Sequence, residues 1–175
     1  MEIQAVNASQ AVIPREYALV LLGAGGIAIL YVLTVYFFTM AARLSVFRRG
    51  FMRKFDEEHQ KAFGLPKAPQ YGYPDSGNGR YAKQLPYADW YKMNNGQRAQ
   101  INFLEQITFI LVCSVVASLS FPQYAFWLQI GFIVGRFLFT VGYTSSGPNA
   151  RLPGALIMDV CILAALVLSG MTIYK

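Results

Sequence analysis

The sequence predicts an all-α fold, in which a bundle of four transmembrane helices forms one membrane domain over residues 1–175, with a long cytosolic-side loop between helices 1 and 2. Hydrophobic residues make up 55% of the chain and charged residues only 14%, whereas soluble domains carry about 25% charged residues. The apolar residues gather in four runs, each near the ~20 residues that a helix needs to cross a bilayer. Eleven of the fifteen Lys and Arg residues lie between Arg43 and Arg98, beside these runs. This distribution favours a membrane-adjacent loop over a nucleic-acid surface.

The four spans are expected at residues 17–42, 101–121, 122–143 and 152–174. The first holds no charged residue, and the other three hold one each, namely Glu105, Arg136 and Asp159. Spans two and three are separated by little more than residues 120–122, which predicts a tight helical hairpin.

Charge asymmetry predicts the orientation of the spans. The loop at residues 43–97 carries ten basic and five acidic residues, and the short loop at residues 144–151 carries Arg151. Because basic loops stay on the cytoplasmic side, both loops are expected to face the cytosol and both termini to face away.

The long loop has two features of its own. Residues 64–79 are rich in Gly and Pro and are expected to be irregular, after a helical tail at residues 57–60. The loop is also crowded with aromatic residues, which either form an interfacial belt or dock another protein. These residues are Tyr71, Tyr73, Tyr81, Tyr87, Trp90 and Tyr91.

Several kinds of site have no support in the sequence. Cys113 and Cys161 both lie in apolar runs, and His59 is the only histidine, so neither a disulfide framework nor a metal site is expected. The glycines at residues 23–26 follow no strand, so they do not form a dinucleotide loop. They are expected to let helices approach closely.

The three charges within the spans predict a polar layer. Each charge in a span costs about 2.5–3.5 kcal/mol and persists where it pairs or has a function. Glu105, Arg136 and Asp159 lie seven or eight residues inside the cytosolic helix ends, which places all three at roughly 10–12 Å depth. Two acids and one base leave one acid that needs another cation, a proton or a ligand ammonium.

The start of the second span carries a row of polar residues. Arg98, Asn102 and Glu105 follow i, i+4, i+7 spacing and therefore share one helix face. A zwitterionic ligand would fit this order of cation, amide and anion, and an internal network that ties the helices together would fit it equally.

The third span and the loop that follows it carry a second set of polar residues. Arg136, Thr140 and Tyr143 form a stripe, and Arg151 stands at the mouth of the fourth span. A fixed cation at this position would favour the anionic form of a nearby thiol. The alternative is an ordinary interfacial arginine.

Residues 97–105 read Q-R-A-Q-I-N-F-L-E. This segment resembles the R-A-x-x-N-x-x-E signature of the membrane-associated proteins in eicosanoid and glutathione metabolism, the MAPEG superfamily. Residues 136–151, with their G-Y pair and closing arginine, are similar to the third-span motif of the type-three microsomal glutathione transferase branch. Residues 13–22 resemble the start of that branch.

The resemblance implies a homotrimer in the endoplasmic reticulum or a mitochondrial membrane, with glutathione bound as a substrate between subunits near the cytosolic side. The thiolate of glutathione would then attack a lipophilic electrophile or reduce a lipid hydroperoxide. The implied roles are binding by Arg43, Arg98, Asn102, Glu105 and Arg136, orientation of the tripeptide by Tyr143 and stabilisation of its thiolate by Arg151.

The chain departs from that branch at several positions. Phe139 replaces a tyrosine, Gln106 stands where an aromatic residue is common, Leu44 interrupts a basic pair, and the first loop carries an insertion. These departures leave two other functions open: a non-catalytic accessory subunit among unrelated subunits of a larger membrane complex, and a lipid-presenting scaffold without chemistry.

Overall fold

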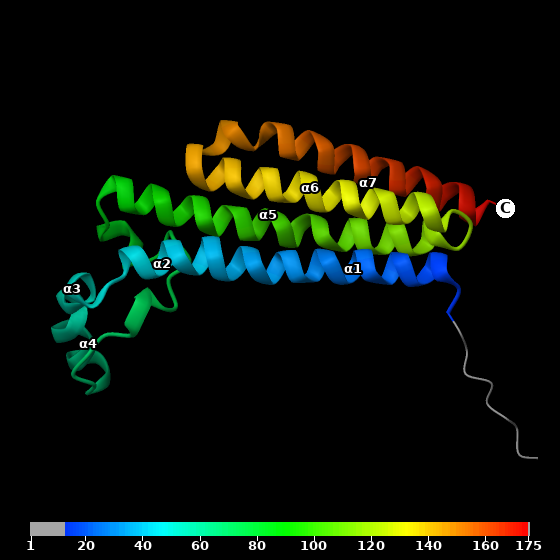
Figure 1. Ribbon diagram of the computed structural model, residues 1–175. Coiled ribbons are helices and arrows are strands. Elements are labelled where there is room, and N and C mark those ends of the chain that lie inside the picture. The colour runs from blue at the N-terminus through cyan, green and yellow to red at the C-terminus, as the bar shows by residue number, and fades with distance from the viewer. Residues whose placement is uncertain (1–12, 175) are drawn as a thin grey trace, which may run out of the picture.

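The computed structural model describes residues 13–174, which form four long helical rods (Figure 1). The first rod runs through α1 (Arg15–Thr34), the π-helical segment η1 (Val35–Met40) and α2 (Ala41–Val46). The other three rods are α5 (Tyr87–Ser118), α6 (Pro122–Ser146) and α7 (Leu152–Ile173). All four rods are long and apolar enough to cross a membrane. The all-α, four-span prediction is therefore confirmed, and the chain is a multi-pass integral membrane protein.

The rods pack as a bundle in which α6 contacts α1, α5 and α7 (Figure 1). The turn between α5 and α6 is short, as expected, because Pro122 occupies the first position of α6, where its missing N–H costs no helical hydrogen bond. The connection from α2 to α5 and the turn from α6 to α7 lie at one end of the bundle, called the loop end below. The prediction that the two charged loops share one face is therefore confirmed.

Close approach of α1 and α6 follows from the small residues in α1. A Cβ atom at Gly26 would lie 3.1 Å from Ile133 Cδ1, and one at Gly23 would collide with the Gln129 side chain. The buried Gln129 amide donates to Ser114 Oγ at 2.8 Å. Gly23 and Gly26 thus act as expected, by letting helices meet, whereas a Cβ atom at Gly25 would have no neighbour within 4 Å.

The long loop is more ordered than the sequence predicts. α5 begins at Tyr87, fourteen residues before the expected start of the second span at Ile101. Residues 47–86, called the loop unit below, contain a series of short helices. These are α3 (Arg49–Met52), η2 (Arg53–Phe55), α4 (Asp56–Phe63), η3 (Gln70–Gly72) and η4 (Ala82–Gln84). The expected helical tail at residues 57–60 belongs to α4, which is separate from the first rod.

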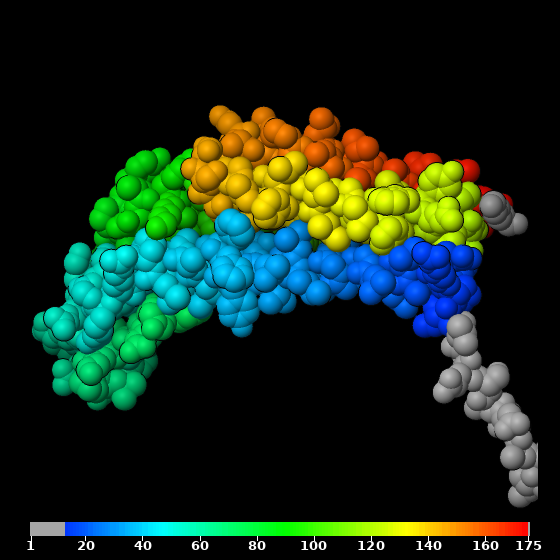
Figure 2. Space-filling model, viewed as in Figure 1, coloured from blue at the N-terminus to red at the C-terminus, as the bar shows by residue number. Residues whose placement is uncertain are grey.

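The loop unit has an apolar core of its own, formed with the adjoining ends of α2 and α5. Phe47, Met52 and Met93 are fully buried in it. Two of the loop's aromatic residues, Tyr81 and Trp90, pack against this core, whereas Tyr71, Tyr73, Tyr87 and Tyr91 are exposed. Figure 2 shows the unit projecting sideways past α1 at the loop end.

An ion pair braces the loop unit near its start. Arg49 Nη1 donates to Asp56 Oδ1 at 2.9 Å, and the same oxygen accepts the backbone N–H of Ala68 at 2.9 Å. The hydrogen bond from Arg49 is the main reason that the pKa of Asp56 lies below its ordinary value. The contribution of this pair to stability is therefore lost only as the pH falls into the acidic range.

Candidate functional site

A cleft of about 230 Å³ opens at the loop end between α5, α6 and α7. Its wall combines polar side chains from α5 and α7 with an arginine from the turn that precedes α7. The lining residues are Asn102, Glu105, Gln106, Phe139, Arg151, Leu152, Ala155 and Asp159. Three of the predicted site residues, Asn102, Glu105 and Arg151, are thus brought together.

The α5 wall offers hydrogen-bonding groups that no described residue uses. Asn102 Nδ2 and Gln106 Oε1 are both buried and have no partner within residues 13–174. Gln106 Nε2 donates to Asp159 Oδ1 at 3.3 Å, which links α5 to α7 across the cleft. Because unsatisfied buried polar groups cost about 1–3 kcal/mol each, a ligand that satisfies the free amide groups would gain that energy.

Arg151 is held at the cleft by aromatic rings. It ends the short helix η5 (Pro148–Arg151), and its guanidinium carbon lies 5.8 Å from the Phe139 ring centroid and 5.3 Å from that of Tyr143. Gly142 allows this turn to fold back onto α6, because a Cβ atom there would collide with the Ala150 carbonyl oxygen. No described carboxylate forms an ion pair with Arg151.

The charges of the cleft complement a ligand that carries a cation. Glu105 and Asp159 supply two carboxylates against the single guanidinium of Arg151. The structure therefore keeps the imbalance of two acids and one base that the sequence predicts, with Arg151 as the base in place of Arg136.

Arg136 is predicted to bind the ligand, but it lies outside the cleft. It is 0% exposed and does not line the cleft. Its guanidinium carbon lies 4.5 Å from the Phe103 ring and 4.4 Å from the Phe139 ring, and Nη2 donates to the Ala99 carbonyl oxygen. No described acid pairs with it, and its Nε and Nη1 atoms have no partner among the described residues. Two aromatic rings thus enclose Arg136, apart from the cleft that Glu105 and Asp159 line.

Arg43 is also used inside the protein. It is 4% exposed, donates to the carbonyl oxygens of Tyr71 at 3.1 Å and Asp75 at 2.5 Å, and lies 4.4 Å from the Tyr73 ring. These partners all come from the loop unit, so Arg43 joins that unit to the first rod and does not line the cleft.

The remaining predicted residues lie near the cleft without lining it. Arg98 is exposed one turn before Asn102 on α5. Tyr143 is buried, with its ring centroid 5.7 Å from that of Phe139. Their roles in binding and orientation stay predictions.

Sequence reasoning placed Asp159 in the polar layer but did not predict that α7 forms a wall of the cleft. Leu152, Ala155 and Asp159 line the cleft at i, i+3, i+7 spacing. This spacing was a usable signal, since it places the three side chains on one helix face. The Gln106–Asp159 contact had no local signal, because it depends on how α5 and α7 pack.

Among the described residues, no group of three or more His, Cys, Asp or Glu side chains could hold a metal ion. A family model described as the MAPEG family matches residues 21–171, which include every residue that lines the cleft. No curated protein matches the chain.

Proposed function

The chain belongs to the MAPEG family, and from that premise we propose that it is a membrane-bound glutathione transferase or peroxidase acting on lipophilic substrates. The observation that carries this proposal is the cleft itself. An arginine without an ion-pair partner among the described residues stands there beside two carboxylates and an unused amide donor.

The chemistry rests on activation of the substrate's thiol. A thiol with an ordinary pKa of about 8.5 is mostly protonated at neutral pH. A nearby guanidinium stabilises the thiolate, and the semi-dry rim of a membrane cleft strengthens that effect. The only histidine, His59, lies on α4 in the loop unit and lines a different pocket. Arg151 is therefore proposed as the activating residue, acting through its charge.

In both proposed reactions, the bonds that form and break can be written at the thiolate sulfur. In transfer, the thiolate sulfur forms a bond to an electrophilic carbon, and the leaving group departs with its electron pair. In reduction, the thiolate sulfur attacks the terminal oxygen of a lipid hydroperoxide, so that an S–O bond forms and the O–O bond breaks. The alkoxide takes up a proton and leaves as an alcohol, and glutathione sulfenic acid remains. A second glutathione then forms the disulfide and releases water.

The same groups suit the ends of glutathione. Glu105 or Asp159 would accept the ammonium group, and Asn102 Nδ2 would donate to a carboxylate or peptide oxygen. The cleft of about 230 Å³ is smaller than the ~300–1,000 Å³ typical of ligand pockets. We therefore place the complete site in the homotrimer that the resemblance implies, where a neighbouring protomer would close it and Arg98 would lie at the junction.

Thermal unfolding with and without glutathione tests binding. Glutathione at 100 times its dissociation constant should stabilise the purified protein by about 2.7 kcal/mol, seen as a raised midpoint. The Arg151→Ala variant should lose glutathione thiolate absorbance and about tenfold or more of its turnover of a lipophilic electrophile, equivalent to ~1.4 kcal/mol.

The matched control is Arg48→Ala, since Arg48 is exposed in the loop unit and should keep both properties. Unchanged turnover in Arg151→Ala would remove Arg151 from the mechanism.

A non-catalytic accessory subunit is the second candidate. Two observations favour it: Phe139 brings no hydroxyl to the cleft wall, and Arg43 is committed to the loop unit. This function predicts no midpoint shift with millimolar glutathione, no transferase or peroxidase turnover, and co-purification with unrelated membrane subunits from native membranes.

A further inference from the structure

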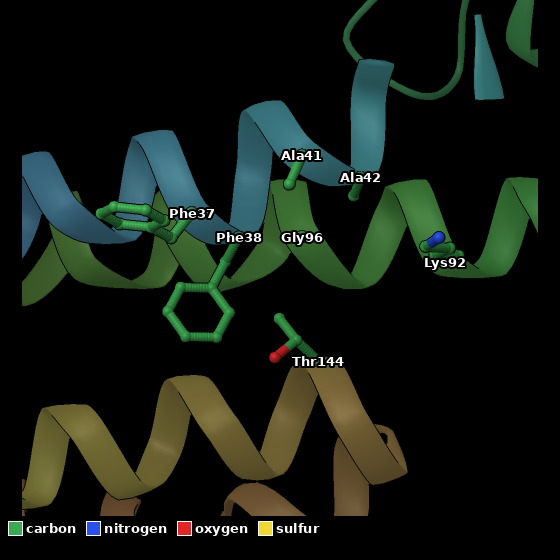
Figure 3. A pocket seen from close by; sticks show the side chains of 7 residues that line it. All are labelled: Phe37, Phe38, Ala41, Ala42, Lys92, Gly96 and Thr144. Carbon is green, nitrogen blue, oxygen red and sulfur yellow. The ribbon is translucent and has the colours of Figure 1, made fainter. Parts of the chain in front are cut away.

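A second cavity lies at the loop end, between the end of the first rod, α5 and the end of α6 (Figure 3). It has a volume of about 190 Å³ and shares no lining residue with the cleft. Its lining residues are Phe37, Phe38, Ala41, Ala42, Lys92, Gly96 and Thr144. We propose that this cavity binds an anionic single-chain amphiphile, with the carboxylate or phosphate head on Lys92 and the chain against Phe37 and Phe38.

The π-helical segment η1 shapes one wall of the cavity. Thr39 Oγ1 in η1 donates to the Gly96 carbonyl oxygen of α5 at 2.9 Å, in a buried contact. A Cβ atom at Gly96 would lie 3.1 Å from both Ala42 Cβ and the Phe38 carbonyl oxygen. The backbone of α5 therefore packs directly against the first rod at this point. π-Helical turns are rare and frequently occur at functional sites. Figure 3 shows the Phe38 ring and Thr144 facing each other across the cavity.

Lys92 is the one charged residue that lines the cavity. Its ammonium group forms no ion pair or hydrogen bond with any residue from 13 to 174. The one other polar side chain in the lining, Thr144, donates its hydroxyl to the Thr140 carbonyl oxygen at 2.7 Å. An unpaired ammonium group near a membrane surface attracts an anionic headgroup, and a direct charged hydrogen bond adds to this attraction.

The order of polarity along the cavity matches that of a lipid in one leaflet. Lys92 lies four residues before Gly96 on α5, and Gly96 packs against Phe38 and Thr39, so Lys92 lies about 6 Å nearer the loop end than these residues. Phe37 lies within the first apolar span and is 69% exposed. A head held by Lys92 would therefore leave its chain running toward the bilayer centre along Phe37.

The size of the cavity favours one chain. Its 190 Å³ is below the ~300 Å³ at which pockets for drug-sized ligands begin. There is room for a small head and its adjoining methylene groups, while the rest of a chain lies on the exposed side of Phe37. A two-chain phospholipid would have to leave its second chain outside.

Equilibrium binding to the full chain in nonionic detergent tests the proposal. The probes are myristate, a lysophosphatidate with the same chain, tetradecanol and inorganic phosphate. Myristate or the lysophosphatidate, or both, should bind about tenfold more tightly than tetradecanol, since only an anionic head forms a hydrogen bond between charged groups with Lys92. Which of the two binds identifies the head as carboxylate or phosphate.

Two variants and a control locate the site. Lys92→Gln should reduce the affinity for the anionic probe about tenfold and abolish its preference over tetradecanol. Ala41→Phe, at an exposed lining position, should block binding by filling the cavity. Lys83→Gln removes an exposed lysine of the loop unit that does not line the cavity, and it should bind as the wild type does.

Three results would overturn the proposal. Equal affinity for tetradecanol, myristate and the lysophosphatidate would show an apolar groove without head recognition. Phosphate binding as tightly as the amphiphile would show a simple anion site. Unchanged affinity in both Lys92→Gln and Ala41→Phe, with helical circular dichroism retained, would place the ligand elsewhere.

Discussion

Phe139 is the residue at which the interior of the bundle meets the cleft. The guanidinium groups of Arg136 and Arg151 lie 4.4 Å and 5.8 Å from its ring centroid. Cation–π contacts contribute about 0.5–1 kcal/mol when exposed and about 2 kcal/mol when desolvated, so the ring stabilises both cations. A phenylalanine fills this role as well as a tyrosine would, but it offers no hydroxyl to a ligand. In the proposed function, thiol activation at this cleft therefore rests on Arg151.

Arg136 leads to a prediction about buried charge. Its Nε and Nη1 atoms have no partner among residues 13–174, and each unsatisfied donor costs about 1–3 kcal/mol. Replacing buried ion pairs with apolar residues of similar volume is often neutral or stabilising, and Arg136 has no described acid partner that its replacement would leave unpaired. We expect Arg136→Met to change the free energy of unfolding by less than about 1 kcal/mol, measured from the thermal unfolding midpoint in detergent.

The comparison variant is Arg136→Ala, which removes the same charge and also leaves a void beside Phe103 and Phe139. Truncation of a large buried side chain to alanine costs about 2–5 kcal/mol, so this variant should be clearly less stable than Arg136→Met. If both variants unfold alike and early, the charge of Arg136 is needed, and the free donors have a partner outside this protomer.

At the scale of helices, the shape of the cleft depends on how closely α6 and α7 cross. A Cβ atom at Gly154 in α7 would lie 2.5 Å from the Gly135 carbonyl oxygen and 2.7 Å from Phe139 Cα. These are backbone atoms, which cannot rotate away as side chains do. The crossing therefore requires glycine at residue 154, and it sets the distance between the α7 wall and Phe139.

We expect Gly154→Ala to destabilise the protein by about 1–3 kcal/mol, because it overpacks this crossing. Gly170 is the matched control, since it lies in the same helix with nothing within 4 Å of its added Cβ atom. Gly170→Ala should be neutral or stabilising by up to about 1 kcal/mol. Thermal unfolding of the two variants checks this, and equal midpoints would show that α6 and α7 separate without cost.

The four spans could be predicted because each is a run of apolar residues with its own hydropathy signal. The first part of α5, residues 87–100, gave no such signal, because only one side of it is apolar. Trp90 and Met93 pack on the core of the loop unit, while Tyr87 and Lys92 face outward. A helix stabilised by tertiary contacts with a distant insertion cannot be read from local hydropathy.

Part of the cleft could also be predicted from a local signal in the sequence. Asn102 and Glu105 share a face of one helix, which spacing shows directly. The positions of Arg43 and Arg136 could not be predicted in this way. The partners of Arg43 lie about thirty residues away in the loop unit, and Arg136 is enclosed by aromatic rings that only the packing of α5 against α6 brings together.

On the scale of the whole molecule, the loop unit and the bundle are joined at a few points. Arg43 reaches from α2 to two backbone carbonyl groups of the unit. From the α5 side, Trp90 Nε1 and Asn94 Nδ2 donate to the Gly77 carbonyl oxygen at 3.1 Å and 3.0 Å. These hydrogen bonds and the shared apolar core hold the loop unit beside the end of the first rod.

We predict that Arg43→Met loosens the loop unit and leaves the bundle intact. Loss of the charged hydrogen bonds should raise the rate of tryptic cleavage within residues 47–86 about tenfold, corresponding to ~1.4 kcal/mol of local stability. The control Arg48→Met changes an exposed arginine of the loop unit, and cleavage at the other sites within residues 47–86 should keep the wild-type rate. Glutathione binding then separates the two roles considered for Arg43. If Arg43 only fastens the loop unit, the variant keeps its affinity for glutathione while cleavage accelerates. If Arg43 contacts a ligand carboxylate, as the family resemblance implies, affinity falls and cleavage stays slow.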